Sequence, residues 1–136
     1  MPECDEVMLT VRITAAERAL LRRLAQSHRS DLSEVVADGL LDVLPTLHRQ
    51  SDAFRLLAAL APPAPCGQTV WLPAPLADLL VLAAARVAQL TGVRLGSASA
   101  ILGAAVRLWL SQDPQHLEAN LSVMHAGRGA ALAVVA

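Results

Sequence analysis

The first part of the chain opens with an alternation of apolar and polar residues. Leu9, Val11 and Ile13 are apolar, and polar residues separate them. A period of two with β-branched side chains is typical of a strand that buries one face and exposes the other. The alternation therefore predicts a short strand over residues 8–13.

A helix is predicted directly after this strand. Thr14 and Glu17 have the spacing of a capping box, in which each side chain bonds the backbone amide of the other residue. We expect the helix to extend from Ala15 to about His28. Its apolar stripe consists of Leu20, Leu21, Leu24 and Ala25, and its outer face carries Arg18, Arg22 and Arg23.

A second helix is predicted after a polar break. Ser30 or Asp31 can cap its first turn, and apolar residues then recur at helical spacing. Pro45 lies inside this apolar stripe. Because proline lacks an amide hydrogen and clashes with the preceding turn, we expect the helix to end or kink near Leu44.

The same order of patterns returns after a connecting stretch. Residues 46–60 favour a further helical piece, and the proline-rich residues 61–67 favour a semi-rigid linker. Residues 68–73 then alternate again and predict a second strand. Two helices follow it, the first closed by Gly92 and the second opened by the small residues 96–99.

Strand, helix and helix thus occur twice. Superposing the two strands aligns Thr10 with Thr69 and Arg12 with Trp71. The last helix of the second copy then begins about seven residues late, which is close to two helical turns. A first helix lengthened by two turns would keep its buried face. The chain divides into a first copy (7–47), a connecting segment with the linker (48–66), a second copy (67–112) and a C-terminal extension (113–136).

The two predicted strands need each other, because a lone short strand cannot satisfy its own hydrogen bonds. We expect residues 8–13 to pair antiparallel with residues 68–72 of the same chain, with Val11 opposite Val70. Pairing between chains in a swapped dimer is the competing arrangement, since the linker is long enough for either. The fold class that follows is mainly α with one short two-stranded antiparallel ribbon.

Residues 7–47 resemble the ribbon-helix-helix DNA-binding family of the Arc, MetJ and CopG type. The resemblance rests on Leu-Thr-Val-Arg-Ile-Thr at 9–14, the leucine-rich helix, and Ser-Asp-Leu-Ser-Glu-Val-Val at 30–36. Residues 67–111 resemble the family more loosely. The family commonly has glycine between the two helices, where this chain has His28, Arg29 and Ser30. Some members fuse two copies, so the resemblance implies a tandem ribbon-helix-helix that forms an intramolecular pseudo-dimer.

The resemblance implies sequence-specific binding of double-stranded DNA, as in a transcriptional repressor, an antitoxin, or an accessory protein of plasmid transfer or partition. In the family the outward side chains of the ribbon enter the major groove. Arg12 can address guanine in bidentate fashion, whereas Trp71 can stack on DNA or instead cover an apolar neighbour. The implied base-contacting residues are Met8, Thr10, Arg12, Thr69 and Trp71.

The amino end of each second helix is the other family feature, because its free amides and positive dipole hold a backbone phosphate. Asp31 competes with a phosphate at the first of these ends. The alternative interpretation is an ordinary capped helix. The implied phosphate-contacting residues are Arg29, Ser30, Ser33, Arg94, Gly96, Ser97 and Ser99.

Composition limits how DNA could be bound. The net charge of the 136 residues is -1, and all 11 basic residues are arginine, a usage that suggests a GC-rich bacterial gene. There is no global positive field, so contact with DNA must be local. Near-neutral charge and Trp71 favour an alternative function, a protein-interaction module that keeps the fold without binding DNA.

Other functions find little support. No nucleophile, phosphate-loop or zinc motif is present, and His28, His48, His116 and His125 lack ligand spacing, so we expect no enzyme, cofactor or metal. Glu34, Asp38 and Asp42 recur every four residues and predict a solvated helix face that points away from DNA. The acidic amino end and the charges inside the apolar stretches predict a cytoplasmic protein without a membrane span.

The C-terminal extension is the least regular part. Residues 115–124 favour a helix, which we expect residues 127–129 (Gly-Arg-Gly) to break. The uncharged residues 130–136 either pack on the core or hold a partner. We therefore expect residues 115–136 as a candidate protein-binding segment, and self-association of the chain on adjacent DNA sites.

Overall fold

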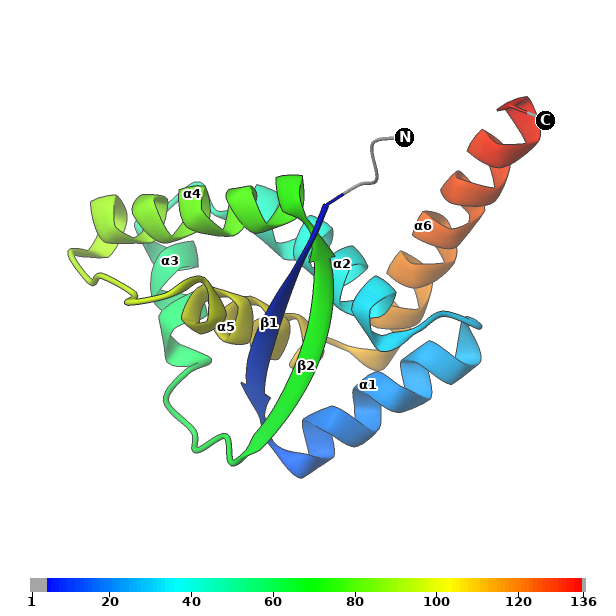
Figure 1. Ribbon diagram of the computed structural model, residues 1–136. Helices are drawn as coiled ribbons and strands as arrows, with labels where there is room; N and C mark the ends of the chain where they lie inside the picture. Colours follow the sequence, from blue (N-terminus) through cyan, green and yellow to red (C-terminus); the bar gives the residue numbers. More distant parts are fainter. Residues whose placement is uncertain (1–4, 136) are drawn as a thin grey trace.

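The computed structural model describes residues 5–135 and the side chains of residues 5–124. It is mainly helical, with one two-stranded antiparallel sheet, as the sequence predicted. The two strands lie side by side at the centre of Figure 1, and the helices pack around them. The elements are β1 (Glu6–Ile13), α1 (Ala15–Ser27), α2 (Leu32–Val43), the 3-10 turn η1 (Leu44–Thr46), α3 (Gln50–Ala58), β2 (Cys66–Pro73), α4 (Ala74–Thr91), α5 (Ala98–Leu110) and α6 (Pro114–Val135).

The sheet pairs β1 with β2 of the same chain, which confirms intramolecular pairing. Its inner face is buried at Val11 and Val70, which have no exposed surface, and half-buried at Leu9. The predicted register is wrong by two residues, because Leu9, not Val11, lies opposite Val70. A shift of two residues leaves the same side chains on the inner face. The alternation in the sequence therefore determined which face is buried but not the register.

The first helix begins and ends as its local sequence predicts. Glu17 N donates to Thr14 Oγ1 at 3.1 Å and Thr14 N donates to Glu17 Oε1 at 2.8 Å, which completes the capping box. At the other end Ser30 N donates to the carbonyl of Ala25 at 2.9 Å. Arg29 lies between these residues with φ 51°, the left-handed conformation that glycine usually supplies. This turn therefore places an arginine in a conformation that favours glycine.

Helices α2 and α5 are packed against one another in the core. Asp31 caps α2 by accepting from Glu34 N at 2.8 Å. The helix ends at Val43, just before Pro45, as predicted. A Cβ added to Gly39 would lie 2.6 Å from Cδ2 of Trp109, so the indole ring of α5 lies directly on this glycine. The contact requires a residue without a side chain on α2.

The second copy accommodates its extra residues in two places. Helix α4 has 18 residues against 13 in α1, so five of the seven extra residues lengthen the helix. The other two lie in the turn between α4 and α5, which begins at Gly92 in the left-handed conformation with φ 78°. The prediction that the helix alone would absorb two turns was therefore only partly right.

Two predictions about polar and C-terminal segments are wrong. Asp38 is 4% exposed and Asp42 pairs with His116 of α6, so the acidic residues of α2 do not form one solvated face. Helix α6 covers this side of α2 and buries Leu117 and Leu121 against the core. The same helix continues through residues 127–129 to Val135, because two glycines among good helix formers do not suffice to end it.

One described helix, α4, is long and apolar enough to cross a membrane, with a mean hydropathy of 1.4 over its 18 residues. Only the length and the apolar composition of α4 indicate a membrane span. In the fold α4 buries Leu76, Leu80 and Val87 in the core, which is the ordinary use of an apolar helix in a folded domain.

Candidate nucleic-acid interface

The outer face of the ribbon carries all five predicted base-contacting residues. Met8, Thr10 and Arg12 alternate with half-buried and buried residues along β1, and Thr69 and Trp71 do so along β2. Each of the five is exposed. The register places them in cross-strand pairs, with Thr10 opposite Thr69 at the centre. The structure therefore brings together on one face residues that lie almost sixty positions apart in the sequence.

The two ends of this outer face differ in chemistry. At one end Met8 lies opposite Trp71, and both are large apolar side chains, 58% and 50% exposed. At the other end Arg12 lies opposite Gly67, and its Nη2 donates to the carbonyl of Pro65 at 2.9 Å. One such bond holds the guanidinium at the end of the strand and leaves its other donors for a ligand.

The amino end of α2 lies beside the Trp71 end of the ribbon. Ser33 Oγ accepts a hydrogen bond from the backbone amide of Trp71 at 2.9 Å, so it satisfies an edge group of β2. Asp31 caps the helix, and Glu34 lies exposed in its first turn. Ser30 Oγ donates to the carbonyl of His28 at 3.3 Å. Two carboxylates therefore compete with any phosphate here, and Arg29 is the nearby cation of the α1–α2 turn.

The amino end of α5 lies beside the Arg12 end of the ribbon. Ser97 caps this helix by accepting from Ala100 N at 3.2 Å, and its first turn has no acidic residue. Ser97, Ser99 and Arg12 line one cavity of about 430 Å³, which the linker around Pro63 closes on its other side. Arg94 and Gly96 lie exposed in the preceding turn. This end of the face is the less acidic one.

A part-buried ion pair positions the arginine that holds the linker at this cavity, and sequence reasoning did not single it out. Arg107 of α5 is 5% exposed, and its Nε donates to Glu17 of α1 at 3.1 Å. Its Nη1 donates to the carbonyl of Pro62 at 2.8 Å. A lone arginine within the otherwise apolar stretch at residues 98–110 was the available signal, because such a charge needs a buried partner.

Two of the described histidines, His28 and His116, pair with carboxylates of other elements. His28 Nε2 lies 2.6 Å from Glu118, and His116 Nε2 lies 3.0 Å from Asp42, so both pairs attach α6 to the body of the protein. Among the described residues no group of three or more His, Cys, Asp or Glu side chains is placed to hold a metal ion. Cys66 is a free thiol, and Cys4 lies outside the described residues.

Comparisons of the chain with protein-family models, with curated proteins and with solved structures found no match.

Proposed function

We propose that this chain is a sequence-specific double-stranded DNA-binding protein that reads the major groove with the outer face of its ribbon. The observation that carries the proposal is the placement of five polar, apolar and cationic side chains on one exposed face of a paired ribbon whose other face packs on the core. A two-stranded ribbon fits the major groove, where Arg12 can bond guanine and threonine can contact a base or a thymine methyl.

The proposal includes a pseudo-dimer formed by the two strand-helix-helix copies. Helix α4 begins 59 residues after α1, at Ala74 and Ala15, and Thr69 follows Thr10 by the same interval. Thr10 and Thr69 are also directly paired. A pseudo-twofold axis that relates the copies would therefore pass through this pair. The pair lies at the middle of the outer face of the ribbon, which we call the reading face.

The residues that this axis relates differ, so the two ends of the reading face are unequal. The axis relates Arg12 to Trp71, so one half of the ribbon offers a guanidinium where the other offers an indole. The two halves cannot read the same bases. We expect the site bound by one molecule to be non-palindromic, and any repetition in a longer operator to come from a second molecule.

The test is a titration of labelled DNA from the protein's own locus with the full chain. Arg12→Ala should weaken binding to the preferred site by about 1–3 kcal/mol, roughly 5- to 150-fold, and relax base preference at one position. Arg55→Ala is the matched control, because Arg55 is an exposed arginine on α3, away from the ribbon. Arg12→Lys should retain non-specific binding and lose the base preference.

The salt dependence of the same titration separates base contacts from phosphate contacts. Replacing Arg18, Arg22 and Arg23 of α1 by alanine should weaken specific and non-specific binding alike. The slope of log K against log salt should fall by about 0.9 for each phosphate that the variant no longer neutralises. Undetectable binding to all locus DNA at low salt, or unchanged binding by Arg12→Ala, would refute the proposal.

A protein-interaction module is the second candidate function. The apolar pair of Met8 and Trp71 and the carboxylates of Asp31 and Glu34 favour it, because together they make one end of the face suited to a protein with apolar and basic side chains. Under this alternative Trp71→Ala abolishes partner binding, and the DNA titration stays flat for the unmodified chain.

A further inference from the structure

Helix α4 has an apolar outer face that nothing in the described structure covers. Leu79 and Leu82 are 43% and 64% exposed, and their spacing of three residues places them on one side of the helix, whereas Leu80 and Val87 on another side are buried. Leu41 of α2, 44% exposed, lies across from it. Scattered apolar residues are ordinary on a surface, but several on one helix face mark a contact surface.

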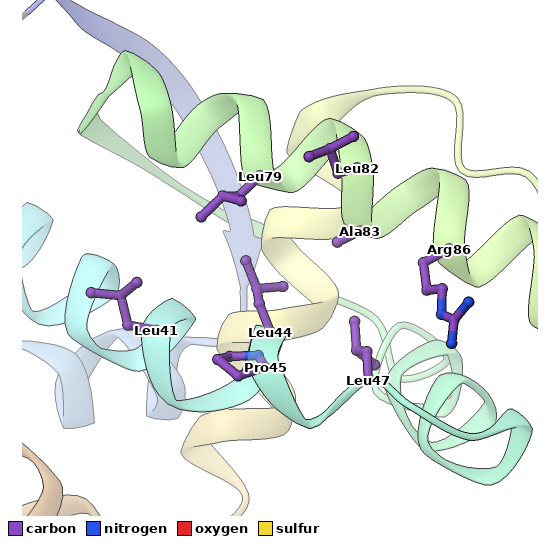
Figure 2. Close-up of a pocket in the computed structure, with 8 residues that line it drawn as sticks. All are labelled: Leu41, Leu44, Pro45, Leu47, Leu79, Leu82, Ala83 and Arg86. Carbon is purple, nitrogen blue, oxygen red and sulfur yellow. The ribbon is translucent and has the colours of Figure 1, made fainter.

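A groove runs along this face. It has a volume of about 280 Å³, and Figure 2 shows the side chains of α4 on one side of it and those of α2 and η1 on the other. Leucine side chains dominate both walls, so the groove suits aliphatic groups. The residues that define it for this argument are Leu41, Leu44, Pro45, Leu79, Leu82 and Arg86.

The charges on α4 indicate what covers the groove. Asp78 and Arg86 are both exposed, and each lies four residues from Leu82, one before it and one after it. A spacing of four places all three on one face of the helix. If two α4 helices pack antiparallel with Leu82 on the twofold axis, Asp78 of each copy lies opposite Arg86 of the other. The face is therefore complementary to itself in both apolar character and charge.

The described contacts leave these charges available. Arg86 has one long hydrogen bond, from Nη2 to the carbonyl of His48 at 3.4 Å, and no hydrogen bond or ion pair of Asp78 is found within the described part of the chain. A lipid surface would gain nothing from Asp78 at the centre of its contact, whereas a second copy pairs it. We propose that the α4 face forms a twofold interface with a second copy of this chain.

The pairing closes on itself, so it produces dimers and not filaments. Two helices of 18 residues, each about 27 Å long, offer a small contact, so we expect an interface no larger than the lower end of specific contacts, about 1,200 Å². We therefore expect a concentration-dependent dimer. The inference does not rest on DNA binding, and its test uses the protein alone.

The experiment is sedimentation velocity of the full chain from about 1 to about 200 µM, a range that spans dissociation constants typical of weak dimers. The unmodified chain should shift from monomer to dimer. Leu82→Glu places two carboxylates at the axis and should weaken the dimer at least tenfold. Val123→Glu is the matched control, because Val123 is an equally apolar residue, 70% exposed, on α6.

A charge exchange tests the twofold geometry itself. Asp78→Arg alone should weaken the dimer, and adding Arg86→Asp to it should restore association. Circular dichroism establishes that each variant is folded. The proposal is overturned if the unmodified chain stays monomeric throughout, if Leu82→Glu dimerises like the control, or if the double exchange gives no rescue. Binding of the monomer to phosphatidylglycerol vesicles, abolished in Leu82→Glu, would assign the face to lipid instead.

Discussion

The two strand-helix-helix units, residues 6–43 and 66–110, share many of their buried positions and differ on their surfaces. Leu21 of α1 and Leu80 of α4 occupy corresponding positions, 59 residues apart, and neither has exposed surface. The next two positions are Arg22 and Arg23 in α1 but Val81 and Leu82 in α4, and all four are exposed. The core requires only the inner face to be apolar, so the outer faces are free to serve different ligands.

The same contrast holds at the helices that meet in the core. Residues of α2 and α5 correspond at an interval of 66, as Ser33 and Ser99 do. By this correspondence Gly39 is matched by Ala105, and Trp109 by Val43. One copy therefore supplies the large ring and the other supplies the space for it. Each copy alone would lack either the ring or the space.

The largest expected effect is at the contact between Gly39 and Trp109. Gly39→Ala and Trp109→Val together give both copies the same residues at these positions. In the unmodified chain Gly39→Ala should lower the free energy of unfolding by about 1–3 kcal/mol, because the new methyl group overlaps the Trp109 ring. Trp109→Val should cost about 3–5 kcal/mol through the cavity it leaves. In the Trp109→Val background, Gly39→Ala should instead stabilise by about 1 kcal/mol, since alanine favours the helix.

Urea denaturation of the four proteins measures this change of sign. If Gly39→Ala has the same effect in both backgrounds, Trp109 does not set the requirement for glycine.

A smaller effect is expected on the reading face, if the ribbon binds DNA. Trp71→Arg gives both copies an arginine at corresponding positions. The preferred site should become more palindromic, with a new guanine preference of about 1–3 kcal/mol in the second half. Selection of binding sites from random DNA, for the unmodified chain and the variant side by side, reveals the preference. Identical selected sites would show that the two ends are not related by the proposed axis.

The smallest effects are expected at the two turns. Arg29 and Gly92 both adopt positive φ, but only Gly92 does so without steric cost. Arg29→Gly should therefore stabilise the protein by about 1 kcal/mol, and Gly92→Ala should destabilise it by about the same amount. Thermal unfolding compares the two. If Arg29→Gly also weakens DNA binding, the strained arginine has a binding role; a neutral or destabilising Arg29→Gly would contradict the strain.

Local features of this protein could be predicted from sequence because short-range chemistry decides them. Three such features each depend on residues within a few positions: the Thr14–Glu17 capping box, the end of α2 before Pro45 and the end of α4 at Gly92. The alternation of Val11 and Ile13 likewise determined which face of the ribbon is buried. It follows that the five outward residues of the candidate site could be named in advance.

The tertiary structure alone decided the features that depend on distant residues. The ribbon register differs from the predicted one because two registers that differ by two residues bury the same side chains, and only packing distinguishes them. Asp42 of α2 meets His116 of α6, and Arg107 meets Glu17 and Pro62, through contacts between segments 45–90 residues apart. No local pattern encodes such contacts, because a charged residue has the same helical spacing whether its side chain faces solvent or a buried partner.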